Sequence, residues 1–269
     1  MDNLPNLEVV RAVASVARAK PADGDGMPKM EVRFSAFDEW YEIDSFFEGN
    51  FIERTEHGAF AKTIAEQRAQ VRSLFDHGFD PSIGNKVLGT ISDLREDKDS
   101  PVGEVDLFDT SYNRDLLPGL KAGVYGSSMR MRVVKDEWVK APDASTYNPK
   151  ALPERTIKEV RLYEFGPVTF PANPQSTASV RSATDDYYQA LRARDPQLVD
   201  DLTRSRQSQI ALDRNQQPPA GTAKPAGAAE PATTEPAASH SGGLTPGARR
   251  QRLTPSLKGK PQCRTSTLT

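Results

Sequence analysis

Two segments, VYGSSMRMRVV (residues 124–134) and TIKEVRLYEFGPVTF (residues 156–170), carry the clearest strand pattern in this chain. Apolar and polar residues alternate along much of both segments, and β-branched and aromatic residues are frequent, as is typical of strands. The proline-rich stretch APDASTYNPKALPE (residues 141–154) separates them and is typical of a loop. We therefore expect a fold organised around a sheet.

Shorter segments with strand or helix patterns precede these two. We predict strands or extended segments over residues 7–17, 29–37, 41–47, 71–76, 86–94 and 102–109. We predict helices over residues 57–70 and 111–121. The first has Phe60 and Ile64 four positions apart, and the second ends before Gly123, a common residue just past a helix end. Many short strands with few helices favour a mainly β fold with peripheral helices (α+β) over a doubly wound α/β fold.

The aromatic residues are distributed unevenly along the 269 residues, and none follows Tyr188. A segment with no aromatic and few large aliphatic residues cannot bury enough apolar surface to offset the entropy lost on ordering. We therefore expect one folded domain over residues 1–181, a helical extension over residues 182–212, and a low-complexity, disordered tail with a basic end over residues 213–269.

The charge balance and the single cysteine argue against several classes of protein. The chain has 35 Lys and Arg against 37 Asp and Glu, a formal net charge of −2, whereas a dedicated nucleic-acid-binding protein has a basic excess. No apolar run approaches the roughly 20 residues of a membrane-spanning helix, and the N-terminus lacks the apolar centre of a signal peptide. Cys263 alone cannot form a disulfide framework or a cysteine-rich zinc site. We expect a cytoplasmic protein with no membrane partner and no specific nucleic-acid partner.

Three histidines make up the chain's whole inventory: His57, His77 and His240. His240 lies in the low-complexity tract, and His57 stands beside Gly58 at the start of a predicted helix. His77 follows an apolar strand and precedes a Gly/Pro-containing loop. A side chain at such a strand end is held by a rigid element yet open to a cleft, which suits a general base. The alternative is an ordinary surface histidine.

A pair of serines, Ser127 and Ser128, begins the apolar-alternating part of the first long strand. A serine becomes a nucleophile when an adjacent base accepts its proton. Consecutive strand residues point to opposite faces, so only one of the pair can face a histidine. Ser128 shares its face with Arg130 and Arg132, while Ser127 shares its face with methionines. The arginine face is expected to be the open, polar one.

Glu164 is an acid within the otherwise apolar second strand, between Tyr163 and Phe165. An inward-facing carboxylate is costly unless it is paired or hydrogen-bonded. Glu164 either faces water on a half-exposed strand or supports the imidazolium of His77, as the acid of a Ser-His-acid triad does.

Together and in this order, these segments resemble the prohead (capsid maturation) proteases of tailed bacteriophages, a serine peptidase family related in fold to the herpesvirus assemblins. The matching segments are HGAF (57–60), LFDHGFDPSIGNKVLGTI (74–91), GVYGSSMRMRV (123–133) and EFGPVTFPANP (164–174). The resemblance implies an assemblin-like β-barrel protease domain over residues 1–181.

Matched position by position, the resemblance places the catalytic histidine on His77, the nucleophile on Ser128 and the acid on Glu164. Ser127 is the alternative nucleophile. A Ser-His dyad, or another acid such as Asp76 or Asp106, is the alternative to Glu164.

The family resemblance implies a serine endopeptidase that uses neither metal nor cofactor. It would act inside the procapsid in the host cytoplasm, cleave scaffold protein or the scaffolding segment of the major capsid protein, and cleave itself. A homodimer is a further expectation. Backbone N–H groups are the commoner donors to an oxyanion, with Arg130, Arg132 or Arg161 as side-chain candidates. The rival interpretations are a catalytically inactive scaffold or capsid-assembly protein on the same fold and, more distantly, an unrelated β-barrel binding module.

Overall fold

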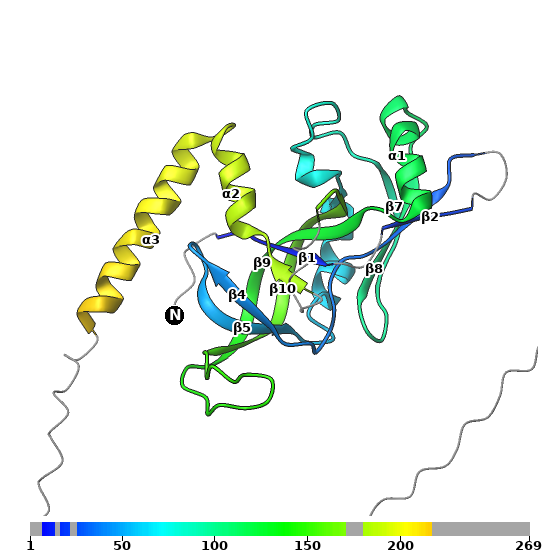
Figure 1. Cartoon of the computed structure of the whole chain (residues 1–269). Coiled ribbons are helices and arrows are strands. Elements are labelled where there is room, and N and C mark those ends of the chain that lie inside the picture. The colour runs from blue at the N-terminus through cyan, green and yellow to red at the C-terminus, as the bar shows by residue number, and fades with distance from the viewer. Residues whose placement is uncertain (1–6, 14–16, 22–25, 171–179, 217–269) are drawn as a thin grey trace, which may run out of the picture. The chain divides into compact units, whose positions relative to one another are not determined.

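Two sheets hold the strands of the computed structural model, which describes residues 7–13, 17–21, 26–170 and 180–216 (Figure 1). The larger sheet has the order β11 (Val180–Ser182), β1 (Val9–Val13), β9 (Gly126–Val139), β10 (Glu154–Val168), β5 (Gly49–Thr55) and β4 (Tyr41–Ser45), and the short strand β6 (Arg72–Ser73) also pairs with β10. The smaller sheet has the order β2 (Arg18–Lys20), β3 (Lys29–Arg33), β8 (Pro101–Leu107) and β7 (Gly89–Glu96).

The two long strands predicted from the sequence, β9 and β10, are antiparallel neighbours at the centre of the larger sheet. Ser128 lies opposite Gly166 of β10 on one side and opposite Ala12 of β1 on the other. Arg130 lies opposite Glu164, beside an irregularity in the register of β10. A residue of β9 is therefore fixed by backbone hydrogen bonds on both sides.

The apolar core lies between the two sheets. Phe34, just after β3, stacks on Phe165 of β10 with ring centroids 4.7 Å apart. Gly103 of β8 makes this close approach possible, because a Cβ atom there would lie 2.2 Å from the Phe165 ring. Met129 and Met131 of β9 are fully buried in the same core.

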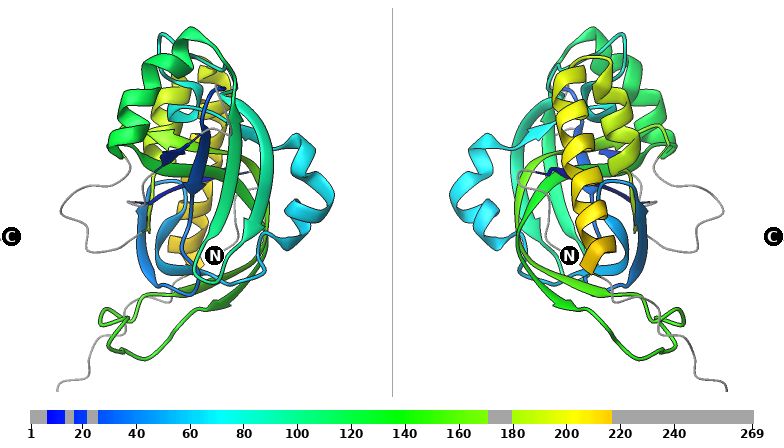
Figure 2. Two further views of the ribbon diagram at one scale, coloured as in Figure 1. Left: turned by 90° about the vertical axis from the view of Figure 1, so that its right-hand side faces the viewer. Right: turned by 90° about the vertical axis from the view of Figure 1, so that its left-hand side faces the viewer.

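Three α-helices lie at the periphery of the sheets: α1 (Ser111–Ala122), α2 (Thr184–Arg192) and α3 (Pro196–Gln216). Helix α1 ends as predicted, because Gly123 adopts the left-handed conformation (φ 66°) that glycine favours. The helical pattern predicted after residue 182 is also confirmed, and α3 begins at Pro196, a residue well suited to a first helical turn. Helices α2 and α3 form a hairpin, seen from the side in Figure 2.

The predicted and observed elements differ at several places. The helix predicted over 57–70 starts with a turn and becomes helical only from residue 61, with a π-helical segment at Thr63–Gln67. The strand predicted over 71–76 shrinks to β6, because the chain turns there into the His77 loop. Strand β5 was not predicted: it lies between β10 and β4, is largely buried, and so has little alternation.

The mainly β fold class with peripheral helices is confirmed, but the described strands form open sheets rather than a closed barrel. The two end strands of the larger sheet, β4 and β11, are not paired with each other in the described part of the chain. Side-chain hydrogen bonds bridge this edge instead: Ser182 Oγ donates to Glu48 Oε1 at 2.8 Å, and Ser45 Oγ donates to Asp185 Oδ1 at 2.7 Å.

Most of the predicted tail lies outside the described residues. Residues 213–216 form the end of α3, and residues 217–269, with His240 and Cys263, are not described. The PANP part of the last family segment, residues 171–174, is also outside them. Among the described helices, none is long and apolar enough to cross a membrane.

Candidate active site

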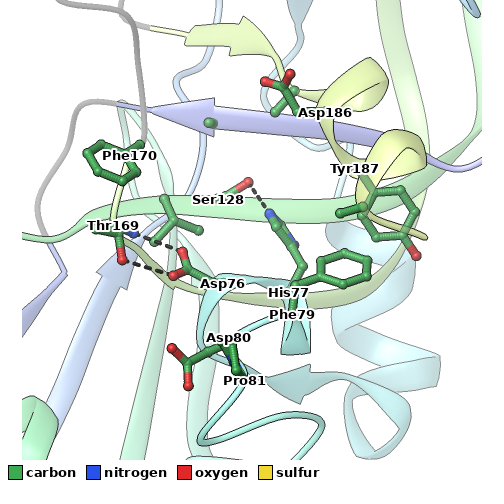
Figure 3. Close-up of a pocket in the computed structure, with 14 residues that line it drawn as sticks. Asp76, His77, Phe79, Asp80, Pro81, Ser128, Thr169, Phe170, Asp186 and Tyr187 are labelled. Carbon is green, nitrogen blue, oxygen red and sulfur yellow. Dashed lines mark hydrogen bonds between the residues drawn. The ribbon is translucent and has the colours of Figure 1, made fainter. Parts of the chain in front are cut away.

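His77 sits in a loop with an unusual backbone. Asp76, His77 and Gly78 have positive φ angles of 43°, 55° and 77°. Non-glycine residues avoid this region, and such strain persists only where surrounding contacts fix it. One such contact comes from the end of β10, where Thr169 donates to the Asp76 carboxylate from its backbone N (2.8 Å) and its Oγ1 (2.9 Å) (Figure 3).

The loop brings His77 between the two other residues predicted for the site. Its Nε2 lies 2.8 Å from Ser128 Oγ, and its Nδ1 lies 2.5 Å from Glu164 Oε1. An ionised carboxylate only accepts hydrogen bonds, so Nδ1 carries the proton and Nε2 is left free to accept one from Ser128. The three side chains thus form one hydrogen-bonded series.

The two serines occupy the opposite faces of β9 that the alternation predicts. Ser127 faces the core with Met129, and its hydroxyl donates to the backbone carbonyl of Arg33. Ser128 faces His77, and its Oγ also lies 3.0 Å from the backbone oxygen of Arg11. Only Ser128 is brought to the histidine.

Glu164 is almost fully buried, with 2% of its side chain exposed. The charge of Arg130 compensates that of its carboxylate. The Arg130 Nε lies 3.6 Å from Glu164 Oε1, and the same guanidinium is paired with Glu8. Burial by itself would lower the pKa of Arg130, but Tyr187, Glu164 and Glu8 together raise it above its ordinary value. The buried acid that holds His77 therefore lies beside a permanently charged arginine.

A pocket of about 440 Å³ opens beside Ser128 and His77. Its walls are mainly apolar and come from β1, the His77 loop, the end of β10 and helix α2 (Figure 3). The residues that line it are Ala12, Asp76, His77, Phe79, Asp80, Pro81, Ser128, Val168, Thr169, Phe170, Ala183, Asp186, Tyr187 and Ala190. A mostly apolar pocket with a hydroxyl and an imidazole at its edge has the general character of a ligand-binding site.

A known protein family matches more than half of this chain. The sequence pattern of the caudovirus prohead serine proteases matches residues 19–190. The chain belongs to this family. The structure of the bacteriophage T4 capsid assembly protease, gp21, is similar with a TM-score of 0.36 and 13% identity, over 61% of this chain and 98% of that one. A search of curated proteins finds no match. The family resemblance stated from the sequence is confirmed.

In this prohead protease family member, the alternative residues His57, Asp76 and Asp106 have other partners. The His57 ring packs on Phe37 with centroids 5.0 Å apart. Asp76 binds Thr169, and Asp106 pairs with Lys29 across the smaller sheet at 3.3 Å. The hydrogen bond to His77 Nδ1 comes from Glu164. Within the described residues, no three His, Cys, Asp or Glu side chains gather as metal ligands would.

None of the three arginines considered as oxyanion donors lines the pocket of this family member. Arg130 lies behind Glu164. Arg132 and Arg161 face each other across β9 and β10 and line a separate, smaller pocket. The alternation along β9 predicted the strand face of Arg130 and Arg132, but it did not predict the distance between their side chains and Ser128.

The sequence patterns did not predict that helix α2 forms one wall of the pocket. Ala183, Asp186, Tyr187 and Ala190 all line the pocket, although the helical segment was expected to lie outside the folded domain. The family match, which extends to residue 190, includes most of this helix. The domain limits at 181 and 212 stay predictions, but α2 borders the site. The apolar positions Tyr188 and Leu191 were the available signal, because they indicated a helix with one face to bury.

Proposed function

We propose that this chain is a serine endopeptidase of capsid maturation with Ser128 as nucleophile, His77 as general base and Glu164 as the acid that orients it. The observation that carries the proposal is the pair of hydrogen bonds through the His77 ring, 2.8 Å to Ser128 Oγ and 2.5 Å to Glu164 Oε1. Membership of the prohead serine protease family supports the reaction class.

In the proposed mechanism, His77 Nε2 takes the proton of Ser128 as Oγ attacks the scissile carbonyl. The imidazolium formed is stabilised by Glu164, to which Nδ1 donates. His77 then gives the proton to the leaving amine, and an acyl group remains on Ser128. Water attacks this ester with His77 again as base, releasing the second product and restoring the hydroxyl.

The proposed substrates are scaffold protein or the scaffolding segment of the major capsid protein, together with the protease itself. Cleavage would take place inside the procapsid in the host cytoplasm, and the proposed active form is a homodimer. Family membership supports the capsid proteins as substrates. The pocket walls, which include Phe79, Val168 and Tyr187, suit an apolar substrate side chain next to the cleaved bond.

Co-expression with the major capsid protein proposed as the substrate tests the proposal. Wild type should truncate itself and shorten the capsid protein, with both cuts located by intact-mass spectrometry, while Ser128→Ala should leave both full length. His77→Ala should also abolish processing, whereas the control His57→Ala, on a ring packed against Phe37, should retain most of it. Full-length products from folded wild type would instead support an inactive scaffold or assembly protein.

A further inference from the structure

We propose that Arg194, in the turn between α2 and α3, is a positioning residue for catalysis that holds the loop carrying His77. The inference rests on the proposed function, since it assigns His77 the role of base. Arg194 lies beyond the segment matched by the family pattern, which ends at residue 190. The support for this role comes from its contacts.

The His77 loop needs an external support on both sides. Asp76 and His77 have positive φ angles, which non-glycine residues avoid, so the backbone there is held away from its preferred conformations. On the side before His77, Thr169 fixes Asp76 through two hydrogen bonds. On the side after His77, the fixing group is the guanidinium of Arg194.

Arg194 contacts the loop at three points. Its Nη2 donates to the backbone oxygen of Gly78 at 2.6 Å, and its Nη1 donates to Asn85 Oδ1 at 3.2 Å. Its guanidinium carbon lies 4.6 Å from the centre of the Phe79 ring. The planar fork therefore ties Gly78 to Asn85, the two ends of the segment that follows His77, across the intervening turn.

Helix α2, which precedes Arg194 in the chain, is anchored to the rest of the domain. The Tyr188 hydroxyl is bonded to both the backbone N and the backbone O of Glu8, and Asp185 accepts from the backbone N of Phe46 at 2.8 Å. The same helix places the Tyr187 ring edge-on to His77, with centroids 6.0 Å apart. Helix α2 therefore packs on the His77 ring through Tyr187. Arg194, just after the helix, binds the backbone that follows His77.

The consequence is that the alignment of His77 depends on residues outside the strands that carry the nucleophile and the acid. Ser128 and Glu164 are fixed by their neighbours in the sheet. His77 lies in a loop, and loss of one support lets its ring move relative to Ser128 Oγ. A misplacement of about 1 Å can lower a rate by about 100-fold.

The test compares full-length Arg194→Ala and Arg194→Lys with Arg192→Ala as a matched control. Arg192 is two residues away and also exposed, but it contacts Asp200 and Thr203 of α3 instead of the loop. The readout is the rate at which a fluorophosphonate labels Ser128, measured from pH 5 to 9 on variants with wild-type circular dichroism.

Arg194→Ala should label about 10- to 100-fold more slowly than wild type. Arg194→Lys should recover part of the rate, because one ammonium group can reach the Gly78 oxygen but cannot span to Asn85. Arg192→Ala should label at the wild-type rate. Equal rates for Arg194→Ala and Arg192→Ala would overturn the inference.

A second measurement separates this inference from the proposed function. Proton NMR of the His77 Nδ1–H bonded to Glu164 reports the ring position whether or not the chain cleaves protein. Arg194→Ala should shift or broaden this resonance, and Arg192→Ala should not. If wild type fails to label at Ser128 while the resonance still responds to Arg194→Ala, the protease assignment fails but the positioning role stands. An unchanged resonance in Arg194→Ala contradicts the positioning role.

Discussion

At Ser128 the hydroxyl oxygen has two acceptors within reach, His77 Nε2 at 2.8 Å and the Arg11 backbone oxygen at 3.0 Å. A serine hydroxyl has one proton, so it donates to one acceptor at a time. In the proposed mechanism, donation to His77 is the reactive arrangement and donation to Arg11 is an unreactive one. The hydroxyl of Ser127 reaches neither of these acceptors, because it donates to the backbone oxygen of Arg33 on the core face.

We predict that Ser128→Ala abolishes fluorophosphonate labelling and processing, while Ser127→Ala retains most of the activity. Loss of the Ser127 hydroxyl leaves the Arg33 carbonyl without this donor and should lower the free energy of unfolding by about 1–3 kcal/mol. Labelling rates and urea unfolding of both variants check the prediction. The reverse result would move the nucleophile to Ser127.

Glu164→Gln should lower the cleavage rate by about 10³- to 10⁴-fold, as the equivalent acid-to-amide change does in Ser-His-Asp proteases. The amide group of a glutamine can donate to Nδ1 and so place the ring proton on Nε2, where it blocks transfer from Ser128. Single-turnover cleavage of the capsid substrate measures the effect, with circular dichroism as the folding control. Full activity would mean that the site is a Ser-His dyad or uses a different acid.

At the scale of elements, the site forms where the segment before His77 runs directly against β10. Strand β6 pairs in parallel with β10 at Glu164 and Phe165, and the backbone N of Leu74 donates to the Phe165 oxygen at 3.2 Å. Gly166 permits this approach, since a Cβ atom there would lie 1.8 Å from the Leu74 oxygen. The spacing between the base and the acid is thus set by backbone packing.

We predict that Gly166→Ala disturbs the site and destabilises the domain by about 1–3 kcal/mol, the usual effect of overpacking. The added methyl group must push the Leu74 segment away from β10, which moves His77 away from Glu164 and slows labelling. Urea unfolding and fluorophosphonate rates measure both effects. The matched control is Gly26→Ala, where no atom of the described residues, other than the glycine and its two chain neighbours, lies within 4 Å of the new Cβ. If Gly166→Ala matches this control in both assays, the packing argument is wrong.

At the scale of the whole molecule, a buried charge network joins β1, the β4–β5 hairpin and β10. Arg11 is fully buried and contacts Glu48 at 2.6 Å and Glu53 at 2.7 Å. Glu53 also accepts from the Tyr41 hydroxyl at 2.6 Å and from Arg155 at 3.2 Å. Breaking such a network leaves an uncompensated buried charge, which is strongly destabilising.

This network predicts a loss of stability in acid. Burial by itself would raise the pKa of Glu48, but its attraction and hydrogen bonds to Arg11 bring that pKa below its ordinary value of 4.5. A carboxyl with a lowered folded-state pKa stabilises the protein above the unfolded-state value. That contribution is lost as pH falls below about 4.5 towards the folded-state pKa.

The unfolding free energy of wild type should therefore fall as pH decreases below the ordinary glutamate range. Glu48→Gln should be less stable at neutral pH by about 1.5–3 kcal/mol, and its unfolding free energy should fall less steeply in acid. Urea unfolding of both proteins between pH 3 and 7 provides the measurement. Equal acid slopes would show that Glu48 does not contribute to this pH dependence.

The amino-acid sequence alone predicts the long strands β9 and β10, the opposite faces of Ser127 and Ser128, and the end of α1 at Gly123. These features depend on local periodicity and on single-residue backbone preferences, which a sequence displays directly. It also supplied the residues of the candidate site, His77, Ser128 and Glu164, through the order of the family segments.

Which of these side chains meet depends on long-range packing, and this packing also adds supports that no local pattern contains. His77 and Glu164 are 87 positions apart in the chain, and their distance depends on the packing of β6 against β10 and of α2 against β1. The wall formed by Tyr187 and the contact of Arg194 with Gly78 arise in the same way. Periodicity fixes the face on which a residue lies, whereas a catalytic distance depends on how segments far apart in sequence pack against each other.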